Sequence, residues 1–131
     1  MLHQLSRHEY RGLNMEGSKA EAKPLFSAEA VERKKYPVYS GVLGYFPAAI
    51  AEVSRVSYMG NEQHNPGQPL HWARGKSTDQ GDTALRHIMD NENSPLDSDG
   101  AYHLAKAAWR ILARLQLLLE SEGSPKAPLA R

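Results

Sequence analysis

Residues 99–122 read DGAYHLAKAAWRILARLQLLLESE, and the spacing of their apolar residues predicts a long helix. Asp99 is suited to cap a helix that runs from about Gly100 to Glu122. The apolar residues recur every three or four positions, which is the period of one helix face: Leu104, Ala108, Ile111, Leu112, Leu115 and Leu118. No segment of the chain alternates apolar and polar residues as a half-buried strand does. The sequence therefore predicts an all-α fold.

Two other main helices are expected earlier in the chain. The first runs from Pro47 to about Met59, because proline suits a first helical turn and Gly60 can follow a last one. The second begins near Ser77 or Thr78, where Ser77 and Gln80 have the spacing of a capping box. A short helix over residues 27–35 and an extended linker over residues 36–41 precede them, the linker because Pro37 disfavours helix at the residue before it.

The whole chain has the length of one domain, at 131 residues. We expect a flexible segment over residues 1–25, a small helical domain of three main helices over residues 26–122, and a polar tail over residues 123–131. With a net charge of +1 and no cysteine, the composition favours neither nucleic-acid binding nor a disulfide framework. No apolar run approaches the roughly 18–20 residues of a membrane helix, so we expect a cytoplasmic protein away from membranes.

A long polar loop over residues 60–75 separates the first two main helices. It exceeds what a connector needs, and a loop of this length in a small domain is commonly functional or disordered. Its contents favour a functional loop: Asn61, Glu62, His64, Asn65, His71, Trp72 and Arg74.

Carboxylates follow this loop at a spacing that suits a metal ion. Asp79 and Asp82 project side by side on a helix, and Mg²⁺ prefers a few carboxylates together with the oxygens of a bound phosphate. Glu52 and Glu62 flank the start of the loop and could approach the aspartates if the helices pack antiparallel. The alternative is a solvated helix face on which Asp82 pairs with Arg86, with both glutamates in solvent or in local ion pairs.

Basic and aromatic residues lie in the same region. Arg74, Lys76 and Arg86 gather near the start of the second main helix, where free backbone N–H groups favour an anion. His71 and Trp72 could form a platform for a base, or Trp72 could simply pack the loop down. The histidines show no H-E-x-x-H spacing and no adjacent His-Asp pair, so we expect them to make substrate or structural contacts rather than to bind metal.

Several motifs together resemble the phage dATP/dGTP diphosphohydrolase family. The resemblance covers roughly residues 33–120, and its most distinctive string is GNEQHNPG at residues 60–67. The other matching segments are PVYSGVL at 37–43, YFPAAIAEV at 45–53, PLHW at 69–72, KSTD at 76–79 with Asp82, LRH at 85–87, Asp99-Gly100 with His103, and AWR at 108–110.

The family implies hydrolysis of a purine deoxynucleoside triphosphate, dATP or dGTP, to the monophosphate and pyrophosphate with a divalent metal. It is similar to the all-helical MazG-type pyrophosphohydrolases, although this chain has Asp79-x-x-Asp82 without their Glu-Glu-x-x-Glu motif.

Residues and resemblance combine into one hypothesis. Asp79, Asp82, Glu52 and Glu62 hold Mg²⁺ or Mn²⁺, and Glu52, Glu62 and Asp82 take part in catalysis. The expected substrate contacts are Asn61, His64, Asn65, His71, Trp72, Arg74, Lys76, Arg86, His87 and His103. We expect a homo-oligomer. Two alternatives stay open: a non-catalytic nucleotide-binding or phage–host interaction protein, and a structural helical subunit.

Overall fold

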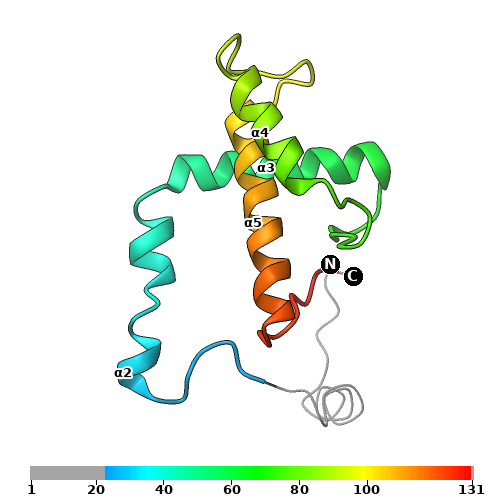
Figure 1. Cartoon of the computed structure of the whole chain (residues 1–131). Coiled ribbons are helices and arrows are strands. Elements are labelled where there is room, and N and C mark those ends of the chain that lie inside the picture. The colour runs from blue at the N-terminus through cyan, green and yellow to red at the C-terminus, as the bar shows by residue number, and fades with distance from the viewer. Residues whose placement is uncertain (1–22, 131) are drawn as a thin grey trace.

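The computed structural model describes residues 23–130, and within them the chain is helical without a strand (Figure 1). The elements are α2 (Ala30–Arg33), a π-helix η1 (Tyr39–Leu43), α3 (Pro47–His64), α4 (Gln80–Asp90) and α5 (His103–Ser121). The predicted all-α fold with three main helices, α3, α4 and α5, is thus confirmed. The expected flexible segment, residues 1–25, lies almost entirely outside the described residues.

Helix α5 organises the fold because both other long helices pack on it. Helix α4 lies along the N-terminal part of α5, and α3 crosses the same region of α5 (Figure 1). The shorter elements α2 and η1 form an arm that leads away from this crossing; η1 contacts only α3. The arrangement brings the end of α3, the central loop and the facing sides of α4 and α5 around one space.

The first main helix is longer than its sequence predicts. Helix α3 continues past Met59 through Gly60 to His64, although a glycine inside a helix costs about 1 kcal/mol. Its last turn is held by Asn61, which is buried and whose Nδ2 donates to the carbonyl of Gln68 at 2.7 Å. Residues expected in the loop, including His64, therefore project from a helix.

Other boundaries also shift. Helix α4 begins at Gln80 with Asp79 as the residue before it, so Ser77 does not cap it as predicted. The linker over residues 36–41 turns helical from Tyr39, because Pro37 restricts only its neighbour and its carbonyl accepts from the Gly41 amide at 2.7 Å.

The interior between the helices is small and partly polar. The buried apolar residues are all alanines: Ala84, Ala101, Ala105, Ala107 and Ala113. The buried polar ones are Asn61, Gln80, Thr83, His87 and His103. We call the contact region of α4 with α5, which holds Thr83, Ala84, His87, His103 and Ala107, the α4–α5 seam.

Large apolar side chains lie outside this interior. Along α5 five residues of the predicted apolar stripe, including Leu112, are between 48% and 53% exposed, and the other four of them share one face. We call these four the leucine face: Leu104, Ile111, Leu115 and Leu118. Periodicity thus identified the helix correctly, but the stripe does not form a core among residues 23–130.

The described part of the tail lies against the central loop. The Trp72 amide donates to the carbonyl of Leu129 at 3.1 Å, and Arg74 donates to the carbonyls of Ala127 and Ala130 at 3.3 and 2.9 Å. Arg74 also forms a buried ion pair with Glu120 of α5. These contacts join loop, tail and α5 into one wall.

Candidate functional site

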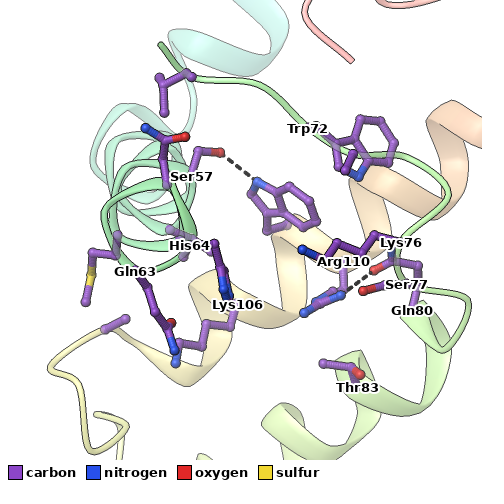
Figure 2. Close-up of a pocket in the computed structure, with 18 of the residues that line it drawn as sticks. Ser57, Gln63, His64, Trp72, Lys76, Ser77, Gln80, Thr83, Lys106 and Arg110 are labelled. Carbon is purple, nitrogen blue, oxygen red and sulfur yellow. Dashed lines mark hydrogen bonds between the residues drawn. The ribbon is translucent and has the colours of Figure 1, made fainter. Parts of the chain in front are cut away.

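A cleft of about 750 Å³ opens between the C-terminal half of α3, the central loop, α4 and α5 (Figure 2). Each element contributes polar side chains to it. In Figure 2, Ser57, Gln63 and His64 come from α3, Lys76 and Ser77 from the loop, Gln80 and Thr83 from α4, and Lys106 and Arg110 from α5.

Two tryptophans form one wall of the cleft. Trp72 of the loop meets Trp109 of α5 edge to face, with ring centroids 5.8 Å apart and an interplanar angle of 78°. The Trp109 indole N–H donates to Ser57 Oγ at 2.8 Å, which ties α5 to α3. The guanidinium of Arg110 lies 5.6 Å from the Trp109 ring centroid. The wall thus offers flat aromatic surface beside a cation.

Basic side chains dominate the lining. They are Lys76, Arg86, Lys106 and Arg110, joined by His64, His71 and His87. Among the described residues that line the cleft, Asp99 is the one carboxylate. Such an excess of cations in a concave site favours an anionic ligand.

Lys106 is held in place by two aspartates from the turn before α5. Its Nζ donates to Asp97 and Asp99, each at 2.7 Å. The turn depends on Gly100, which has a φ of +87° that other residues rarely adopt. Burial lowers the pKa of Lys106, but its hydrogen bonds to both aspartates outweigh this, so the net pKa is raised. The hydrogen bond from Lys106 in turn lowers the pKa of Asp97 to about 2. Lys106 is thus a fully charged, fixed cation.

Two buried amides of the lining have one polar atom each without a partner in the described residues. They are Asn61 Oδ1 and Gln80 Nε2, and these side chains are 9% and 5% exposed. The other amide atom of each is satisfied: Asn61 Nδ2 donates to Gln68, and Gln80 Oε1 accepts from Arg110 at 3.0 Å. Because an unpaired buried polar atom costs about 1–3 kcal/mol, these atoms suit a ligand that supplies their hydrogen bonds.

A histidine pair adjoins the cleft at the α4–α5 seam. His87 and His103 face each other with their Nδ1 atoms 2.9 Å apart, and the carboxylate of Asp90 lies near both. Burial lowers the pKa of His87, and the positive charges of Arg86 and Lys106 add to this effect. His87 is therefore neutral at physiological pH.

The cleft contains most of the predicted substrate contacts. Eight of the ten line it: Asn61, His64, Asn65, His71, Trp72, Lys76, Arg86 and His87. The other two lie beside it. His103 faces His87 from behind, and Arg74 is engaged by Glu120 and the tail. Placement in the lining does not test their roles, which stay predictions.

The four carboxylates expected to hold metal are placed differently. Glu52, Glu62, Asp79 and Asp82 are absent from the cleft lining. Glu52 Oε2 lies 3.7 Å from Arg55 on its own helix, and Asp79 Oδ2 accepts from Thr83 Oγ1 at 3.3 Å. Three other residues meet instead. Among residues 23–130, candidate ligand atoms of His87, Asp90 and His103 lie within 4.8 Å of one another. A single chain does not bring the four predicted acids together.

Sequence reasoning missed several residues of the site. Gln80, Asp99, Lys106, Trp109 and Arg110 line the cleft but were read as helix or cap residues. One signal could have revealed two of them: Lys106 and Arg110 are charged residues within the apolar pattern of α5. Asp90 is not among the predicted site residues, because no spacing rule links it to His103.

The fold and the site define a class of protein: a small all-α domain whose three main helices surround a cation-lined cleft with an aromatic wall. The chain belongs to the dATP/dGTP diphosphohydrolase family, since the family model described as dATP/dGTP diphosphohydrolase, N-terminal, matches residues 27–126. The resemblance seen in the motifs is thereby confirmed. No curated protein and no solved structure matches the chain. None of the helices within residues 23–130 has the length and apolarity needed to cross a bilayer.

Proposed function

We propose that this protein hydrolyses the purine deoxynucleoside triphosphates dATP and dGTP to the monophosphate and pyrophosphate, in the cytoplasm of a phage-infected cell. Family membership supplies the reaction and the substrate class. The observation that carries the proposal is the cleft, where Lys76, Arg86, Lys106 and Arg110 surround a space beside two tryptophans. A triphosphate needs such cations, and a purine suits an aromatic wall.

The chain's own residues divide the work of binding. Lys106 is fixed by Asp97 and Asp99, which balance its charge, so its ammonium group is positioned to donate a hydrogen bond to a phosphate oxygen without rearrangement. Arg110, held by Gln80 at 3.0 Å, offers further N–H donors to phosphate oxygens. The unpaired amide atoms of Asn61 and Gln80 have the acceptor and donor chemistry to recognise polar atoms of the base or sugar.

Mg²⁺ or Mn²⁺ is the expected cofactor, and the lining of one chain does not by itself fit it. Mg²⁺ takes oxygen ligands, but the one carboxylate that lines the cleft, Asp99, is engaged by Lys106. The prediction that Asp79, Asp82, Glu52 and Glu62 hold the ion, with Glu52, Glu62 and Asp82 acting in catalysis, therefore needs their convergence in an assembly or a closed state.

Turnover assays test the reaction and the site separately. Purified protein with dGTP or dATP and Mg²⁺ should release the monophosphate and pyrophosphate.

Lys76→Ala removes an exposed lining cation and should raise KM about tenfold or more, the cost of one hydrogen bond to a charged group. Lys34→Ala, on the distant arm, is the matched control. Absence of turnover with every nucleotide would overturn the proposal, and unchanged turnover in Asp82→Ala would reject the metal assignment.

A second candidate is a nucleotide-binding protein without catalysis. One observation favours it: among the described residues of a single chain, no cluster of carboxylates lines the cleft. This candidate predicts that dGTP or dATP raises the melting temperature, because a ligand that binds only the native state stabilises it, while no product forms.

We also propose that the working form is a homo-oligomer. The leucine face leaves four large apolar side chains about half exposed on the central helix, and contiguous exposed apolar surface marks association sites. A second copy that covers this face would supply the apolar core that the alanines of one chain do not.

A further inference from the structure

The α4–α5 seam places three potential metal ligands together. His87 lies in the last turns of α4, Asp90 follows it one turn later, and His103 is the first residue of α5. The imidazoles are 6% and 7% exposed. Ligand atoms of all three residues lie within 4.8 Å of one another. The group thus joins two helices that are separated by a turn of twelve residues, 91–102.

The two imidazoles are close enough to share an ion. Their Nδ1 atoms are 2.9 Å apart. Two imidazole nitrogens bound tetrahedrally to one Zn²⁺ at about 2.0–2.1 Å each lie about 3.3–3.4 Å from one another, so the rings reach this spacing by moving apart by about 0.4–0.5 Å. A plain hydrogen bond could also join them, but it would hold one ring as a donor and leave the nearby Asp90 carboxylate without a role. Among the described residues that carboxylate has no hydrogen-bond or ion-pair partner.

Charged side chains surround the three ligands. The cations that face the group are Arg86 from α4 and Lys106 from α5, and Asp97 and Asp99 of the intervening turn balance Lys106. Two imidazoles and one carboxylate therefore form a donor set of two nitrogens and one oxygen.

We propose that His87, Asp90 and His103 bind one divalent transition-metal ion of the zinc class. Two nitrogens and one oxygen suit Zn²⁺ and its neighbours, whereas Mg²⁺ requires oxygen ligands. Three protein ligands leave at least one coordination position for water or another ligand. Because His87 also lines the cleft, the ion lies at its wall. The site is distinct from the oxygen site expected for Mg²⁺ and does not depend on the proposed hydrolysis.

Metal binding by the full-length, untagged chain tests this assignment. Protein stripped with a chelator is titrated with Zn²⁺, without nucleotide, by isothermal calorimetry and native mass spectrometry. We expect one Zn²⁺ per chain and a higher melting temperature, since the ion links α4 to α5. Co²⁺ in place of Zn²⁺ should give visible absorption bands that excess Mg²⁺ does not remove.

Matched variants localise the ion. Asp90→Asn and His103→Gln should each weaken Zn²⁺ binding by about 100-fold or more, beyond the 10–100-fold that loss of an outer partner costs. Glu92→Gln, an exposed carboxylate two residues from Asp90, and His71→Gln, a cleft histidine outside the group, should bind as the unchanged protein does. Should His103→Gln not fold, as judged by circular dichroism, Asp90→Asn still decides, because Asp90 is less buried than the two histidines.

Two results would overturn the assignment: no stoichiometric Zn²⁺ in the unchanged protein, or equal affinity in Asp90→Asn and Glu92→Gln. Displacement of Zn²⁺ by Mg²⁺ at similar concentration would equally contradict a zinc-class site. None of these outcomes bears on turnover of dGTP or dATP, so failure here and failure of the proposed hydrolysis are told apart.

Discussion

The α4–α5 seam and the leucine face lie on the same central helix and differ in what they bury. The seam encloses small and polar side chains, among them Ala84, His87 and His103, each less than 8% exposed. The leucine face leaves four large apolar side chains about half exposed. In an ordinary monomer the large apolar residues are inside and unpaired polar atoms are outside.

The proposed roles of the two regions account for this inversion. A polar interior is unfavourable unless its groups are paired, and in the seam His87 and His103 pair with each other at the position proposed for a metal ion. An exposed apolar face is unfavourable unless a partner covers it. The single chain therefore carries one surface suited to small molecules and one suited to another protein, and α5 supplies both.

We expect the largest loss of stability when the buried ion pair that closes the wall of the cleft is removed. Arg74→Ala leaves the Glu120 carboxylate, 8% exposed, without its ion-pair partner, while Gln116 Nε2 and the Ala127 amide still donate to it. We therefore expect a cost of about 3 kcal/mol, the lower end for loss of one member of a buried pair, which urea denaturation measures. Lys35→Ala removes an exposed pair with Glu32 and should cost below about 0.5 kcal/mol. Equal losses in both variants would show that the loop and tail do not form a closed wall.

The next prediction concerns self-association through the leucine face. Leu115→Glu places a charge where a second copy is expected and should weaken self-association by about 2 kcal/mol or more, roughly 30-fold in Kd, because a buried leucine contributes about that much. Sedimentation equilibrium measures the change. Leu96→Glu substitutes a leucine of similar exposure, 45%, in the turn before α5, and should associate normally. A monomeric unchanged protein would refute the role given to this face.

A smaller effect concerns the fixed lysine of the cleft. The folded-state pKa of Asp97 is about 2, against an ordinary 3.8. The ion pair with Lys106 therefore stabilises the fold fully above about pH 4, and this contribution is lost as the pH falls through 2. With partial exposure considered, the loss should be about 1 kcal/mol. Lys106→Met should flatten the pH dependence of unfolding between pH 4 and 2, and an unchanged slope would argue against a fixed lysine.

Two glycines should change stability by similarly small amounts and in opposite directions. Gly60 lies inside α3 with no atom within 4 Å of an added Cβ, so Gly60→Ala should raise the melting temperature through about 0.5–1 kcal/mol of stabilisation. Gly100 has a φ of +87°, and Gly100→Ala should destabilise by about 1–2 kcal/mol. Calorimetric melting of both variants checks the opposite signs. Stabilisation by Gly100→Ala would mean that the turn presenting Asp97 and Asp99 is not under this constraint.

The helices were predictable because their evidence is local. Periodicity identified α3, α4 and α5, and Pro47 marked the start of α3. The end of α3 was not predictable. The helix continues past Gly60 because Asn61 contacts Gln68, and rules for helix ends do not include such a contact. The family strings contain Asn61, His64, His71 and Arg110, which line the cleft, whereas Lys106 lies outside these strings, within the pattern of a long helix.

The amino-acid sequence alone determined the all-α class, the three main helices, the family and a site around the central polar segment. These follow from interactions between residues near in the chain and from distinctive motifs. The tertiary structure alone decided which side chains meet: His87 with His103, Gln80 with Arg110, and Arg74 with Glu120. It also decided that the apolar stripe of α5 faces outward. The reason is physical: helix formation depends on local backbone hydrogen bonds, whereas the choice of buried face depends on how separate helices cross.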